Sequence, residues 1–196
     1  MESSENLEAE YRGLERGLDR ELWVVTSADG SRRGGLIATF VSQASIVSTS
    51  PRVLVGISRR HMTWELIEGS SAFALHLLTE ENLDWVIRFG LQSSRVADKF
   101  AGLGHHPGRS GSPILTGAAG WLDCLVEARF ETGDRTVFLA EVIDALAPKV
   151  SPALTVHRML SLVPEAIRAR FVEDRERDAA QDAEAIRVWR QGGPAD

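Results

Sequence analysis

Hydrophobic and polar positions follow two different rhythms along the chain, and each rhythm predicts its own kind of element. Near the N-terminus, apolar residues recur every three or four positions, at Leu7, Tyr11, Leu14 and Leu18. This spacing places them on one helical face. We therefore expect a short N-terminal helix whose apolar stripe packs on the main body.

From residue 22 onward the rhythm changes to short apolar runs separated by turn residues, which is typical of strands. Asp29-Gly30 is a hairpin signal between the first two runs. Two short helices are expected, one over residues 63–68 capped by Thr63 and one over 80–89. Residues 102–113 are rich in Gly, His, Ser and Pro and predict a long loop. The four predicted strands are residues 22–26, 35–41, 52–57 and 73–78.

The clearest strand pattern covers residues 122–130, where apolar and charged residues alternate with period two. Gly133-Asp134 turns the chain, and residues 137–143 are predicted to return as the antiparallel partner. Cys124 falls on the apolar side, which favours a small core residue over a nucleophile. Several short strands without a βαβ rhythm predict a mainly β fold with helical additions, built on a closed antiparallel barrel.

The tail from Pro164 onward is predicted to be helical, and its run of charged residues indicates a solvated face. Trp189 lies close to the end of the chain, which indicates that the tail docks on another surface. A second subunit is one candidate for that surface.

Composition removes several function classes. The 196 residues carry 28 acidic and 22 basic side chains, a net charge of −6, so no general basic excess favours nucleic acid. A single cysteine excludes an intrachain disulfide and a thiolate zinc cluster. No apolar stretch approaches 18 residues, so we expect no membrane association and a cytoplasmic protein. His105-His106 is interpreted as part of a surface loop, and no metal is expected.

One candidate for chemistry is the segment 38–50, where a predicted strand runs into a series of hydroxyl and small side chains closed by Pro51. Small residues let backbone amides approach a ligand, and hydroxyls hold an anionic oxygen without a lysine. A polar loop that hydrogen-bonds itself explains the same composition. Taken alone, the residues favour this second interpretation.

A second candidate is the segment Ser58–Thr63, which follows a predicted buried strand and contains Arg59, Arg60 and His61. Arginine pairs bidentately with phosphate, and a helix N-terminus adds free amides. Ordinary surface charge explains this segment equally well. If both candidate segments lie at the same ends of neighbouring strands, we expect them to converge on one phosphate.

The order of these segments resembles the flavin reductase-like family, whose fold is the FMN-binding split β-barrel. The resemblance covers about residues 21–146, and the order and spacing of several short segments carry it rather than one motif. It implies a split-barrel domain over residues 21–160, after an N-terminal helix in 1–20 and before a C-terminal helical extension in 161–196. The matching segments are Gly35–Thr39 leading into Ser42 and Ser45, His61–Ile67, Phe73–Leu78, Asp98–Gly102, Ser112–Leu115, Trp121–Cys124 and Gly133–Asp134.

The resemblance also implies roles for individual residues. Arg135 stands where members often have a histidine near the bound nicotinamide, so it would meet a phosphate of the pyridine nucleotide or mark altered donor use. His76 stands where asparagine is common. The implied flavin-binding residues are Thr39, Ser42, Gln43, Ala44 and Ser45 along the phosphate, ribityl chain and ring; Ser58, Arg59, His61 and Thr63 at the phosphate end; and Lys99 and Phe100 near the isoalloxazine or the nicotinamide.

The function expected from this resemblance is a flavin-dependent oxidoreductase that binds FMN, or FAD, and transfers hydride from NAD(P)H to the flavin. Such proteins are homodimers with flavin near the interface, and a partner monooxygenase or other redox protein would receive the reduced flavin. Hydride transfer needs alignment and water exclusion more than acid–base residues, so the catalytic residues stay unassigned. A non-enzymatic FMN-binding electron-transfer module is the alternative, favoured by Arg135. A third interpretation keeps the barrel with a deazaflavin or haem.

Overall fold

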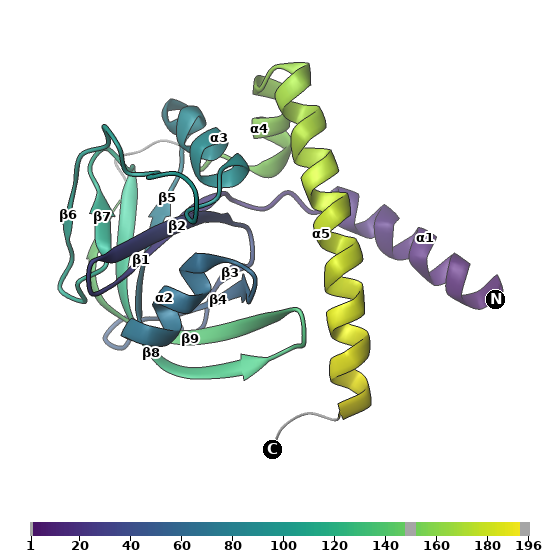
Figure 1. The fold of residues 1–196 in the computed structure, drawn as a ribbon, viewed down its shortest axis with the longest axis horizontal. Helices are drawn as coiled ribbons and strands as arrows, with labels where there is room; N and C mark the ends of the chain where they lie inside the picture. Colours follow the sequence, from purple (N-terminus) through teal and green to yellow (C-terminus); the bar gives the residue numbers. More distant parts are fainter. Residues whose placement is uncertain (1, 148–151, 193–196) are drawn as a thin grey trace.

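A seven-stranded, wholly antiparallel sheet forms the body of the protein, with strand order β2-β1-β5-β8-β9-β4-β3 (Figure 1). The computed structural model describes residues 2–147 and 152–192. The sheet strands are β1 (Trp23–Asp29), β2 (Arg32–Ala38), β3 (Val41–Gln43), β4 (Arg52–Ser58), β5 (Ala72–Leu77), β8 (Gly120–Glu131) and β9 (Arg135–Leu146). A separate two-stranded sheet pairs β6 (His105–Pro107) with β7 (Pro113–Leu115).

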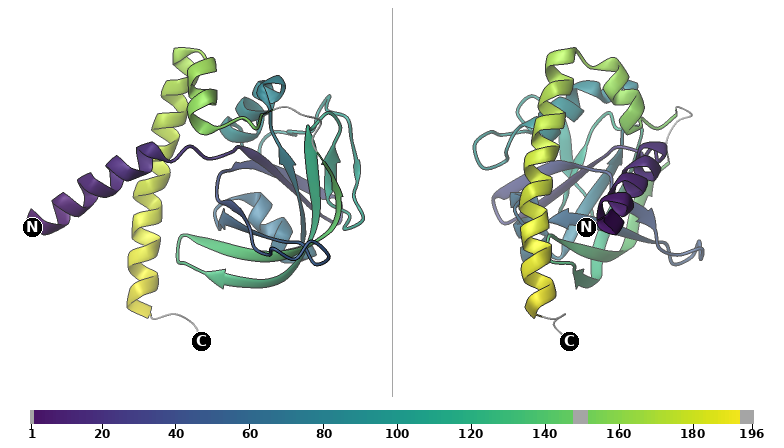
Figure 2. Two further views of the ribbon diagram at one scale, coloured as in Figure 1. Left: turned by 180° about the vertical axis from the view of Figure 1, so that it is seen from behind. Right: turned by 90° about the vertical axis from the view of Figure 1, so that its right-hand side faces the viewer.

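One helix packs into the core of the curled sheet, the N-terminal helix extends away from it, and the long C-terminal helix runs beside it as far as the β8–β9 turn (Figures 1 and 2). The helices are α1 (Glu2–Gly17), α2 (Met62–Ser70), the 3-10 turn η1 (Glu80–Asn82), α3 (Leu83–Leu91), α4 (Val156–Leu162) and α5 (Glu165–Gly192). The predicted fold class, a mainly β split antiparallel barrel with helices at both ends, is confirmed.

Two apolar cores hold these elements together. The first lies inside the curled sheet, where inward residues such as Val25, Val55 and Phe138 are fully buried. The second lies between the sheet and helices α3, α4 and the start of α5, and it includes Phe89 and Leu154. Burial of these side chains is the main favourable term in folding. Cys124 lies in the first core, as predicted, and burial raises the pKa of its thiol.

The β8–β9 hairpin and its turn are confirmed, but its burial does not alternate with period two: Asp123 and Cys124 are both buried beside a register shift, and residues 127–130 are exposed. Phe130 is 60% exposed because the outer part of the hairpin extends beyond the core. At the turn, Gly133 has a φ of +94°, a conformation that glycine adopts without strain. A side chain there would also collide with Trp189 of α5, whose Cβ lies 2.7 Å from the ideal Cβ position. The tail therefore docks through Trp189 on a turn of its own chain.

Three local predictions were wrong. Helix α2 begins at Met62 with His61, not Thr63, in the capping position. The expected long loop contains β6 and β7, which pair through short backbone ladders. The stripe on α1 does not pack on the body: Leu7, Tyr11 and Leu14 are all at least 64% exposed, because α1 extends away from the sheet (Figure 2).

Candidate functional site

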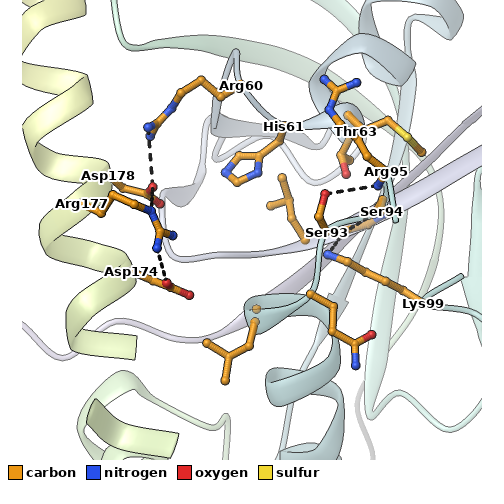
Figure 3. Close-up of a pocket in the computed structure, with 16 residues that line it drawn as sticks. Arg60, His61, Thr63, Ser93, Ser94, Arg95, Lys99, Asp174, Arg177 and Asp178 are labelled. Carbon is orange, nitrogen blue, oxygen red and sulfur yellow. Dashed lines mark hydrogen bonds and ion pairs between the residues drawn. The ribbon is translucent and has the colours of Figure 1, made fainter. Parts of the chain in front are cut away.

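A polar cavity of about 230 Å³ lies between the start of α2, strand β2, the segment after α3, and α5 (Figure 3). Strand β4 ends at Ser58, and the chain turns through His61 into α2. The His61 side chain makes no capping hydrogen bond, so it does not satisfy the first amides of the helix. Such amides, together with the helix dipole, favour an anion at this position.

Lys99 is the most unusual group in the cavity wall, because it is a lysine only 4% exposed. Its Nζ donates to the carbonyl oxygens of Gly35 and Phe89, each at 2.9 Å. An ammonium group has three N–H donors, and among the described residues two carbonyls accept from it. Burial lowers the pKa of Lys99 to about 8. A charge held at this cost, beside a cavity, is typical of a functional group.

The cations near His61 set the electrostatics of the cavity. Burial lowers the pKa of His61, and Lys99, Arg60 and Arg135 lower it further, while the Asp178 carboxylate opposes them. His61 is therefore favoured in its neutral form, and the positive charge of the site comes from the lysine and the arginines.

Helix α5 forms the opposite wall, as Figure 3 shows, and its carboxylates point toward the cations. Arg60 lies 2.8 Å from Asp182 and 3.5 Å from Asp178, and it also donates to Gln181. Arg177 of α5 pairs with Asp174 at 2.8 Å. The cavity is thus lined by charges of both signs.

Arg135 belongs to the same cluster because the sheet register pairs it with Ser58. Its guanidinium donates to Asp134 at 2.6 Å and to Asp182 at 3.0 Å. It also lies 4.5 Å from the centroid of the Phe40 ring. Burial raises the pKa of Asp182, against the opposing effect of Arg60 and Arg135.

The hydroxyl residues 42–50 of the first candidate segment lie at the other end of β4, whereas the beginning of that segment, at Phe40, lies beside Gly56 and Arg135. Gln43 pairs with Val53 near the beginning of β4, whereas Ser58 is its last residue, a separation of roughly 17 Å along a strand. The convergence of the two candidate segments within one chain is therefore wrong, because β3 and β4 run antiparallel and join through the hydroxyl loop. The loop bonds itself: Gln43 Nε2 donates to Ser45 O at 2.7 Å, and Val47 N to Ser45 Oγ at 3.0 Å.

Ser42, Gln43 and Ser45 line a second cavity, of about 660 Å³, whose remaining wall is largely apolar. Trp23, Leu77 and Leu122 of the barrel contribute to that wall. Ala44 lies in the same loop, where its amide donates to Arg52 O at 2.9 Å. The structure therefore places the predicted residues in two groups rather than one.

The other predicted residues lie at the margins of these groups. Thr39 is half-buried between β2 and β3, and Arg59 pairs with Glu131 at 3.6 Å. Phe100 is buried in the second core, in edge contact with the ring of Phe89. Of the predicted residues, His61, Thr63 and Lys99 share the polar cavity, and Ser58 and Arg135 are adjacent to it.

Sequence reasoning missed part of the polar cavity. Ser93 and Ser94 line it after α3, and the only sequence signal was a short hydroxyl pair before an arginine. The acidic residues of α5 were interpreted as a solvated face, since nothing in their spacing indicates contact with Arg60. Within the described residues, no helix has the length and apolarity needed to cross a membrane, and no group of three metal-ligating side chains occurs.

The fold is thus a split antiparallel barrel with a polar cavity, lined by charges of both signs, at the start of a helix. The family described as "Flavin reductase like domain" matches residues 16–160. The chain belongs to this flavin reductase-like family.

Relatives agree with this assignment. The chain is 30% identical over 148 residues to diflavin flavoprotein A 1 of Synechocystis, covering 74% of this chain and 26% of that protein. It is 36% identical over 101 residues to HsaB of Mycobacterium tuberculosis, the reductase subunit of a flavin-dependent monooxygenase, covering 52% of each. The chain thus spans from about a quarter to about half of these relatives' length.

Solved structures share the fold at comparable identity. A homologue of nitrilotriacetate monooxygenase component B from Mycobacterium thermoresistibile has a TM-score of 0.67 at 25% identity, covering 78% of this chain and 83% of that one. The NADH:FAD oxidoreductase SgcE6 of Streptomyces globisporus has a TM-score of 0.64 at 25% identity, covering 70% and 81%.

Proposed function

We propose that the protein is a flavin-dependent oxidoreductase that binds FMN and passes electrons from NAD(P)H to it. The observation that carries this proposal is the polar cavity at the start of α2, which Lys99 and Arg60 line, in a chain of the flavin reductase-like family. At about 230 Å³ this cavity is smaller than the sites that enclose whole cofactors, so it suits the phosphate end of one.

The residues fit such a group by their donors. Lys99 and Arg60 would supply charge-assisted hydrogen bonds to phosphate oxygens, and the amides at the start of α2 would add uncharged ones. Thr63, Ser93 and Ser94 would complete the set with hydroxyls. The flavin, once bound, supplies the redox chemistry, so the chain's own work is binding, orientation and exclusion of water.

The partner is proposed from the relatives. One similar protein is named as the reductase subunit of a flavin-dependent monooxygenase, and another as a homologue of component B of a monooxygenase, which supports delivery of reduced flavin to a monooxygenase. We propose FMN as the flavin, with FAD as the alternative, and either NADH or NADPH as the electron donor. One observation favours the alternative of a non-enzymatic electron-transfer module: Arg135, at the implied nicotinamide position, is held by two carboxylates.

Titration of the purified protein with FMN, followed by quenching of flavin fluorescence, tests this function. We expect saturable binding, followed by reduction of the bound flavin when NADH or NADPH is added. Lys99→Gln should weaken FMN binding by about tenfold, because one charge-assisted contact to phosphate is lost. Arg12→Gln, which removes an exposed positive charge from α1, serves as the control.

The pH dependence separates a ligand contact from a structural role for Lys99. Because its pKa is about 8, the ammonium group is charged below that pH and neutral above it. Affinity for FMN should therefore fall as the pH rises through about 8 in the wild type, and Lys99→Gln should lack this step. Absence of FMN binding contradicts the function, and binding without reduction by either nicotinamide supports the electron-transfer module.

We also propose a homodimer, formed through the outer face of the sheet. Leu54, Leu125 and Phe130 lie on the side of β4, β8 and β9 that faces away from the core, and all three are at least 36% exposed. Contiguous exposed apolar side chains of this kind mark interaction surfaces. Sedimentation should give twice the mass of the chain, and Leu54→Glu with Leu125→Glu should give the monomer. Val188→Glu on α5 is the control, and a wild-type monomer contradicts the proposal.

A further inference from the structure

The groups that would receive ligand phosphates are already paired within the chain. Arg135 begins β9 and pairs with Ser58 at the end of β4, and Arg60 follows Ser58 by two residues. Asp182 of α5 lies between the two arginines, 2.8 Å from one guanidinium and 3.0 Å from the other. Asp178 lies 3.5 Å from Arg60 on the same helix face, one turn earlier.

The arrangement uses most of the donors of Arg60. Its Nε donates to Ser58 Oγ at 3.3 Å, Nη1 to Gln181, and Nη2 to Asp182. A carboxylate and a phosphate present the same chemistry to a guanidinium, namely two oxygen acceptors in the plane of its N–H fork. A phosphate cannot take the in-plane positions on Arg60 while α5 occupies them.

Helix α5 is held unevenly along its length. Its first turns are anchored by Phe171, which packs against Gly90 so closely that a Cβ there would lie 2.9 Å from the ring. No described residue of α5 is fully buried, and contact with the second core is made by Ile167 and Phe171 alone among its described residues. The outer part is held by Asp178, Asp182 and the contact of Trp189 with the hairpin turn, together with a 2.7 Å pair between Arg175 and Glu15 of α1. The pair of Asp182 with Arg135 is largely buried, with the two side chains 16% and 22% exposed. The pairs of Asp178 and Arg175 reach the solvent, and such pairs are individually weak and yield to competing ions.

We propose that the outer part of α5, residues 172–192, is an autoinhibitory latch whose Asp178 and Asp182 carboxylates compete with the phosphate of a nucleotide ligand for Arg60 and Arg135. The proposal rests on the proposed flavin-binding function. The base of α5 stays on the second core and acts as the hinge. Entry of the phosphate replaces the carboxylates at the arginines, and the outer part of the helix is released.

The competition is tested with Asp178→Asn/Asp182→Asn, which keeps the shape of the helix and removes both carboxylates. The matched control is Glu176→Gln/Glu184→Gln, which removes the same charge from exposed positions of α5 that contact neither arginine. We expect the first variant to bind FMN about tenfold more tightly than the wild type. The control should stay within about twofold of the wild type.

Hydrogen–deuterium exchange of residues 172–192 gives a second readout that needs no activity. Exchange should be faster in the ligand-free Asp178→Asn/Asp182→Asn variant than in the control, and FMN should speed it in the wild type. Equal FMN affinity in all three proteins, or slower exchange with FMN, overturns the latch while leaving the flavin function intact. Loss of FMN binding in all three overturns the flavin function, and with it the latch.

Discussion

Replacement of Gly35 by alanine is expected to lower the free energy of unfolding by about 3 kcal/mol, through overpacking of a closed site. A Cβ at this position would lie 2.8 Å from Cε1 of Phe89 and 2.9 Å from the carbonyl oxygen of Val25. Neither neighbour can yield, because Val25 O belongs to the paired backbone of β1 and Phe89 is buried in the second core. Chemical denaturation of the two proteins measures the difference.

Gly13→Ala on α1 is the matched control, since nothing lies within 4 Å of the added methyl group. That substitution should be neutral or slightly stabilising, because alanine favours a helix over glycine. Gly35→Ala should also disturb Lys99, whose ammonium group donates to the Gly35 carbonyl. If Gly35→Ala unfolds at the same denaturant concentration as the wild type, the close packing around Gly35 is contradicted.

Acid is expected to destabilise the protein through His76, by about 3 kcal/mol between neutral pH and about pH 4. The ring is fully buried, with Nδ1 3.1 Å from Val24 O and Nε2 accepting from Leu115 N at 3.0 Å. Burial lowers the pKa of His76 from 6.5 to about 4. Between these values the unfolded chain binds a proton that the folded chain does not, so the free energy of unfolding falls as the pH falls.

Urea denaturation at about pH 7 and about pH 4.5 measures this loss, and most of it should be present at the lower value. His76→Asn removes the titrating group, so its stability should change less between the two pH values even if it is lower at both. If the free energy of unfolding changes equally with pH in the wild type and in His76→Asn, the role of His76 in acid destabilisation is contradicted.

The sequence predicted the barrel because its signals are local. Alternation over residues 122–130 and the glycine turn at Gly133 specify a hairpin without reference to the rest of the chain. The site was harder to predict from the sequence than the barrel, because its composition depends on how the strands pair in register. Nothing local shows that Ser58 pairs with Arg135, or that the hydroxyl loop and Ser58 lie at opposite ends of β4.

Helix α5 marks the limit of sequence reasoning most clearly. Its charges are spaced like those of any solvated helix, and the same pattern would suit a free tail. The role of Asp182 follows only from where the barrel directs Arg60 and Arg135. Conversely, the α1 stripe has the spacing of a packed helix and is exposed in the single chain, because periodicity shows that a face is apolar but not what covers it.

The docking of α5 also constrains the order in which the chain can fold. The pairs that Asp182 makes with Arg60 and Arg135 join residues 122 and 47 positions apart. They cannot form until β4 and β9 have found their register and the Gly133 turn has closed to receive Trp189. We therefore expect these contacts to form late in folding, so that substitutions in the outer part of α5 should act on the rate of unfolding far more than on the rate of folding.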